Sequence, residues 1–78
     1  MQIDEQLDVK GLTCPMPMLK TKKSLAKLSG GQVLEVLATD KNVFEDFNAF
    51  CQQTGHELLL CENAGEGVYR LIVRKKVD

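Results

Sequence analysis

Apolar and polar positions divide the chain into segments that alternate between strand and helix character. In residues 3–9 the apolar side chains fall on one parity, with Glu5 as the exception, which predicts a half-buried strand. In residues 16–28 the apolar residues recur at helical spacing and the lysines lie largely between them, which predicts an amphipathic helix with a basic face. The apolar positions of this helix are Met18, Leu19, Leu25, Ala26 and Leu28.

Proline and glycine mark where this helix begins and ends. Pro15 favours a first helical position, where its missing N–H costs nothing, so we expect Cys14 at the N-cap. Gly30 and Gly31 indicate the end of the helix, because glycine readily takes the left-handed conformation that closes one.

The middle of the chain predicts a strand followed by a second helix. Residues 32–38 are apolar on both parities, a pattern typical of a strand buried on both faces. Residues 39–42 offer several N-cap candidates, and Asn42 with Glu45 has the spacing of a capping box. The helix is expected to run to about Thr54, closed by Gly55. Its inner stripe is Val43, Phe47 and Phe50, with Phe44 and Cys51 on the adjoining row.

Two strands, residues 56–61 and 68–75, are expected to complete the fold, joined by a hairpin connection at residues 62–67. The order of elements predicts an α/β protein of the α+β kind. We expect a two-layer βαβαββ sandwich with both helices on one face of a four-stranded mixed sheet. At this length one domain is expected, covering residues 1–78.

The charges are unevenly distributed along the chain, and this distribution indicates which kind of partner the protein binds. The net charge is −1, yet residues 9–34 hold five lysines and no acid. A slightly acidic protein with one basic segment is poorly suited to bulk nucleic-acid binding, so we expect no direct nucleic-acid partner. A local basic patch suits the steering of one acidic protein partner.

Hydropathy and cysteine content indicate a cytoplasmic protein without membrane insertion. No apolar run approaches the ~20 residues of a membrane helix, and the first eight residues are acidic, unlike a secretory signal. The three cysteines, an odd number, argue against a disulfide scaffold.

The sequence lacks the residue patterns that several kinds of functional site require. Cys14, Cys51 and Cys61 are separated by 37 and 10 residues, which supplies neither a zinc site nor a thioredoxin-type dithiol. Gly30 and Gly31 lack the surrounding residues of a phosphate loop. The single histidine, His56, lies at an expected turn, which favours a structural role. We therefore expect no metal and no cofactor.

The segment around Cys14 is where chemistry is expected. A cysteine at a helix N-terminus meets the positive end of the helix dipole, which favours the thiolate. Pro15 and Pro17 stiffen the segment and leave the N–H of Met16 free to approach a sulfur anion. Positive potential is added by the lysines that follow, Lys20, Lys22 and Lys23. On the residues alone, Cys14 could equally be a small capping residue, and Cys51 and Cys61 fit apolar packing.

At this segment the chain resembles a known family. The run at residues 7–17, Leu-Asp-Val-Lys-Gly-Leu-Thr-Cys-Pro-Met-Pro, is similar to the signature of the TusA/SirA-like sulfur-carrier family. Similarity continues at Gly31, at residues 38–40, at residues 50–51 and at residues 55–58. The resemblance implies a fold similar to the C-terminal domain of bacterial translation initiation factor three. It also implies the structural motif residues Gly11, Pro15, Pro17 and Asp40.

The resemblance further implies a sulfurtransferase that works with partner proteins. A cysteine desulfurase or rhodanese would load sulfane sulfur onto Cys14 as a persulfide. A relay would pass that sulfur toward tRNA thiolation, cofactor assembly or sulfur oxidation. Lys22 falls where some members have an arginine that contacts the donor, and Met16 replaces a residue that is often acidic. The expected docking residues are Met16, Lys20, Lys22 and Lys23.

Two other functions remain compatible with the sequence. The basic helix could bind a partner in a non-catalytic regulatory or interaction module, with Cys14 as a cap only. Alternatively, Cys14 could be a redox-sensing thiol that forms a sulfenic acid or mixed disulfide.

Overall fold

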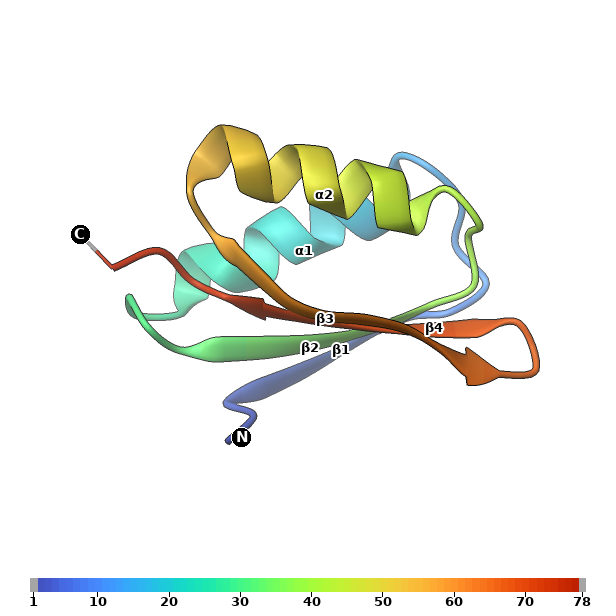
Figure 1. The fold of residues 1–78 in the computed structure, drawn as a ribbon, viewed down its shortest axis with the longest axis horizontal. Helices are drawn as coiled ribbons and strands as arrows, with labels where there is room; N and C mark the ends of the chain where they lie inside the picture. The colour runs from blue at the N-terminus through green and yellow to red at the C-terminus, as the bar shows by residue number, and fades with distance from the viewer. Residues whose placement is uncertain (1, 78) are drawn as a thin grey trace.

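The computed structural model describes residues 2–77, which form strands and helices in the predicted order (Figure 1). The two helices are α1 (Met16–Lys27) and α2 (Val43–Thr54). The strands are β1 (Glu5–Val9), β2 (Val33–Ala38), β3 (Glu57–Gly65) and β4 (Val68–Arg74). Within the described residues, none of the helices has the length and apolar character to cross a membrane.

The strands form one mixed sheet in the order β1-β2-β4-β3. β1 pairs in parallel with β2, from Glu5 opposite Leu34 to Val9 opposite Ala38. β4 is antiparallel to both of its neighbours, β2 and β3. Both helices cover the same face of the sheet (Figure 1), which confirms the predicted two-layer sandwich. Because β1 and β2 are parallel, the loops that follow them leave the sheet at the same edge.

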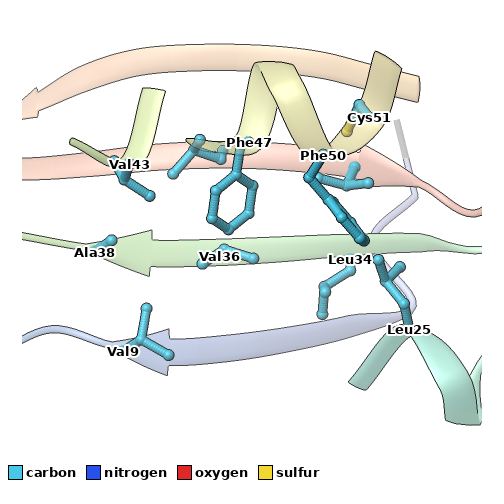
Figure 2. Packing of buried hydrophobic residues seen from close by; sticks show 11 residues of the cluster. Val9, Leu25, Leu34, Val36, Ala38, Val43, Phe47, Phe50 and Cys51 are labelled. Carbon is cyan, nitrogen blue, oxygen red and sulfur yellow. The ribbon is translucent and has the colours of Figure 1, made fainter. Parts of the chain in front are cut away.

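The core lies between α2 and the sheet, as the inner stripe of that helix predicts. Phe47 is 0% exposed and, like Phe50, points from α2 toward β2 (Figure 2). Val43 and Cys51 are also buried, and Phe44 is half-buried against the cluster. Gly55 closes α2 in the left-handed conformation, with φ 88°, as expected.

The buried face of α1 differs from the prediction. Leu19 is 51% exposed and Ala26 is also exposed, so the apolar pattern misplaced both. Leu25 is buried as predicted, and Pro17, Thr21 and Ser24 are buried with it. Thr21 can be buried because its Oγ1 donates a 2.8 Å hydrogen bond to the carbonyl of Pro17, which satisfies the hydroxyl inside the helix.

The β3–β4 hairpin is longer and tighter than predicted. β3 runs to Gly65 instead of ending at residue 61, so part of the expected connection is paired strand. Glu66 and Gly67 form the turn with φ values of 55° and 76°. Positive φ at both central residues is required by the type I′ turn, whose twist matches that of the two strands. The other ends lie within one or two residues of the prediction: β1 begins at Glu5 and α1 ends at Lys27.

The face of the sheet opposite the helices carries a buried carboxylate. Glu35 on β2 is only 8% exposed. It accepts hydrogen bonds from Nε2 of Gln6 on β1 and Nε of Arg70 on β4. The hydrogen bond from Arg70 is the main cause that holds the pKa of Glu35 below its ordinary value. This network ties the three strands together on the face that the helices leave open.

Glu35 is therefore expected to make stability depend on pH. The pKa of Glu35 is lower in the folded state than in the unfolded state, so ionisation of Glu35 stabilises the fold. This stabilisation is complete above the unfolded-state pKa and is lost as pH falls through the folded-state pKa. The free energy of unfolding should fall more steeply below about pH 5 in the wild type than in Glu35→Gln. Urea unfolding at a series of pH values tests this, and parallel profiles for the two proteins would contradict it.

Candidate functional site

Cys14 lies in the loop of residues 10–15, here called the Cys14 loop, between β1 and α1. It runs beside residues 39–42, which connect β2 to α2 (Figure 1). Two hydrogen bonds join the loops: the N–H of Gly11 donates to Oγ1 of Thr39 at 2.9 Å, and the N–H of Cys14 donates to Oδ2 of Asp40 at 3.1 Å. The position of Cys14 therefore depends on a segment 26 residues further along the chain.

Asp40 bridges the Cys14 loop and the start of α2. Its Oδ2 accepts from Cys14, and its Oδ1 accepts from the N–H of Asn42 at 3.2 Å. Asn42 occupies the N-cap of α2 as predicted, but its side chain makes no capping hydrogen bond, so the expected capping box with Glu45 is wrong. Asp40 also brings a negative charge to the backbone of Cys14. This charge opposes the positive potential expected from the lysines of α1 and was not predicted.

The start of α1 corrects two details of the sequence prediction. The N-cap is Pro15, whose carbonyl accepts from the N–H of Leu19 at 3.1 Å, so Cys14 lies one residue before the cap. The N–H of Met16 is not free, because it donates to the carbonyl of Thr13 at 2.9 Å. Cys14 is exposed just before the start of α1 and does not cap the helix itself.

The predicted docking residues lie on two sides of α1. Nζ of Lys22 lies 5.7 Å from the centroid of the Phe50 ring on α2. Lys20 and Lys23 are exposed and, three residues apart, share a side of the helix. Met16 is 41% exposed and lies three residues before the exposed Leu19. These are two exposed apolar side chains on one side of α1, of which the sequence prediction of the docking surface included only Met16.

A groove of about 290 Å³ extends from Cys14 between the two helices. Cys14 and Pro15 line it where α1 begins, and Met18 and Lys22 line it further along that helix. The residues on the α2 side are Asp46, Ala49, Phe50 and Gln53. The sequence did not indicate this groove, because it depends on how the two helices pack.

The other cysteines are enclosed by the fold. Cys51 is buried on the inner side of α2 (Figure 2), and Cys61 on β3 is half-buried and packed against the core. Burial raises the pKa of both thiols above the ordinary value, which lowers their fraction of nucleophilic thiolate. Both positions agree with the packing roles suggested by their apolar surroundings in the sequence.

His56 has a structural position. Its Nδ1 accepts a 2.9 Å hydrogen bond from the N–H of Lys76, and its ring lies 5.5 Å from the Phe50 ring between centroids. It thereby joins the turn after α2 to the segment that follows β4. Across residues 2–77, His, Cys, Asp and Glu nowhere gather in a group of three that could hold a metal ion.

Comparisons relate this chain to known proteins. The family described as Sulfurtransferase TusA matches residues 5–75. The sulfur carrier protein TusA of Allochromatium vinosum is 46% identical over 72 residues, which cover 92% of this chain and 93% of that protein. A relative from Neisseria meningitidis serogroup A is 53% identical over 72 residues, covering 92% and 96% of the two chains. The crystal structure of the SirA-like protein from Desulfitobacterium hafniense has the same fold, with a TM-score of 0.82, 23% identity and coverage of 92% and 97%.

Proposed function

The chain belongs to the sulfurtransferase TusA family, and from this membership we propose that it is a sulfur carrier whose Cys14 accepts sulfane sulfur as a persulfide. It then passes that sulfur to an acceptor protein. The observation that carries the proposal is the contrast among the three thiols. Cys14 is exposed in a loop fixed by Asp40, whereas Cys51 is buried and Cys61 is half-buried.

The proposed reaction needs two thiol exchanges and no cofactor. The Cys14 thiolate attacks the terminal sulfur of a donor persulfide, the donor S–S bond breaks, and the donor cysteine leaves as a thiolate. An acceptor thiolate then attacks the terminal sulfur on Cys14 and releases the Cys14 thiolate. The donor that we propose is a cysteine desulfurase or a rhodanese.

Peptide mass mapping after loading tests this function. The protein is incubated with a cysteine desulfurase and cysteine, or with a rhodanese and thiosulfate. We expect one reducible sulfur atom on the Cys14 peptide and none on the peptides of Cys51 and Cys61. Sulfur on Cys61 with Cys14 unmodified would contradict the assignment. A sulfenic acid formed readily by peroxide, without loading from either donor, would favour the redox-sensing function instead.

Met16, Lys20, Lys22 and Lys23 are proposed as the docking surface for the donor enzyme. Exposed charges near an interface act mainly on the association rate. Lys20→Glu combined with Lys23→Glu is therefore expected to slow loading of Cys14 about tenfold at low ionic strength. Loading of the wild type should also slow as salt is added. Loading rates measured across a salt series check both expectations.

Lys76→Glu is the matched control for Lys20→Glu alone, because each variant reverses one charge. Lys76 is exposed and lies beside Gly55, which closes α2 at the end opposite to the Cys14 loop. The control should load nearly as fast as the wild type, whereas Lys20→Glu should load more slowly. Equal slowing by the two single variants would assign the effect to net charge, and unchanged loading in the double variant would refute the docking surface.

A further inference from the structure

The groove between α1 and α2 carries two charges of opposite sign on its facing walls. Lys22 lines the α1 side and Asp46 lines the α2 side. Among residues 2–77 neither forms an ion pair, although Lys22 lies over the Phe50 ring. Two charges that share a groove without neutralising each other are available to a ligand that carries both signs.

The rest of the lining sets the size and character of that ligand. Met18, Ala49 and Phe50 provide apolar surface, and Gln53 provides an amide that can both donate and accept. The volume of about 290 Å³ is at the lower end of the range for small-molecule sites. A few polar groups set in apolar surface are typical of such sites. A compact zwitterion with a short apolar chain fits this description.

Cys14 lies where a reactive group on such a ligand would be placed. Asp46 is in the first turn of α2, and both helices begin at the edge of the sheet where the Cys14 loop lies. Lys22 is further along α1, and its Nζ lies 5.7 Å from the centroid of the Phe50 ring, about one turn beyond Asp46 along α2. Lys22 lines the same groove as Cys14.

We propose that this groove binds the persulfide of an α-amino acid, cysteine persulfide, which loads Cys14 directly. This proposal rests on the function proposed above for Cys14. The ligand carboxylate pairs with Lys22, its ammonium pairs with Asp46, and its side chain extends toward Cys14. The groove thereby gives the carrier a small-molecule sulfur donor in addition to a protein donor.

The loading step balances without an external oxidant. The Cys14 thiolate forms a bond to the terminal sulfur of cysteine persulfide, and the S–S bond of the ligand breaks. The electron pair of that bond leaves with the inner sulfur, so free cysteine departs as its thiolate. Cys14 now carries the terminal sulfur and its proton as a persulfide.

Kinetics with two small persulfides test the proposal. The rate of sulfur addition to Cys14 should saturate with cysteine persulfide, and should stay linear and slower with 2-hydroxyethyl persulfide, which lacks both charges. Lys22→Met and Asp46→Asn should each lower kcat/KM for cysteine persulfide about fivefold relative to the rate with the uncharged donor, which corrects for any effect of either charge on the Cys14 thiolate. The matched controls are Lys27→Met and Glu45→Gln, exposed residues of the same helices outside the groove.

A binding measurement separates the groove from the chemistry. In Cys14→Ser, which cannot react, NMR titration with S-methylcysteine should shift the amide signals of Lys22, Asp46 and Gln53 saturably. Unshifted amides, or equal and linear rates for the two donors, would overturn the proposal. Amides that move only when the desulfurase is added would assign the groove to a segment of the donor enzyme, and would also overturn it.

Failure of this proposal is distinguishable from failure of the sulfur-carrier assignment. If the desulfurase loads wild-type Cys14 while cysteine persulfide shows no saturation, the carrier function stands and the small-molecule site is rejected. If no donor loads Cys14, the carrier function fails and direct loading fails with it. Saturable binding of S-methylcysteine would then identify the groove as an amino-acid site without sulfur transfer.

Discussion

Cys14→Ser is expected to lose sulfur loading completely, with no sulfur-bearing peptide after incubation with any donor that loads the wild type. Serine differs from cysteine only in the replacement of sulfur by oxygen, and the hydrogen bond to Asp40 comes from the backbone N–H of residue 14, so it should remain. The hydroxyl lacks the thiolate that attacks a persulfide. Intact-protein mass spectrometry measures the loss, and circular dichroism checks that the fold is kept.

Cys51→Ala and Cys61→Ala are the matched controls for this loss. Both residues pack against the core, and alanine keeps an apolar side chain at each position, so loading of Cys14 should continue in both variants. Their free energies of unfolding should decrease modestly because each substitution leaves a small cavity. Loading that survives in Cys14→Ser but disappears in Cys61→Ala would move the function to the sheet and refute the proposed role of the loop.

Phe47→Ala is expected to have the largest effect on stability. Phe47 is fully buried at the centre of the layer between α2 and the sheet (Figure 2). Truncating a buried phenylalanine costs about 3–5 kcal/mol, whereas a chain of 78 residues is typically stable by only ~4–12 kcal/mol. The variant should therefore lose a large share of its free energy of unfolding, as measured by urea or thermal unfolding.

Phe44→Ala is the control for a phenylalanine of the same helix. Phe44 is half-buried and contacts Tyr69 edge-to-face, with the ring centroids 4.9 Å apart. Because less apolar area leaves contact with the protein, the loss of stability should be clearly smaller than for Phe47. Equal losses at the two positions would contradict the placement of the core around Phe47.

The sequence prediction was accurate for the helix whose buried face is apolar and poor for the helix whose buried face is partly polar. The inner face of α2 was predicted correctly because Val43, Phe47 and Phe50 are apolar and repeat at helical spacing. The inner face of α1 was predicted poorly because it buries Thr21 and Ser24, whereas Leu19 is exposed. An internal hydrogen bond makes the burial of Thr21 possible, and periodicity of hydrophobicity does not report such bonds.

The candidate site was predictable only where it is local in sequence. The run from Gly11 to Pro17 indicated a thiol near a helix start, and the structure places Cys14 there, exposed and just before α1. The resemblance to the sulfur-carrier family singled out Asp40, but its hydrogen bond to Cys14 was not predicted, and neither was the groove between the helices. Such contacts are set by tertiary packing, which a pattern along the sequence does not specify.

The position of β4 in the sheet affects when the sheet can assemble during synthesis of the chain. β4 follows the other strands in the chain, yet it occupies a place inside the sheet between β2 and β3. A nascent chain that has not yet delivered β4 from the ribosome has β3 without a neighbouring strand to pair with. Assembly of the complete sheet is therefore delayed until β4 has been translated and has left the ribosome. Until then, β1 and β2 lack the complete sheet that supports the Cys14 loop, so Cys14 reaches its final setting only after β4 has been added.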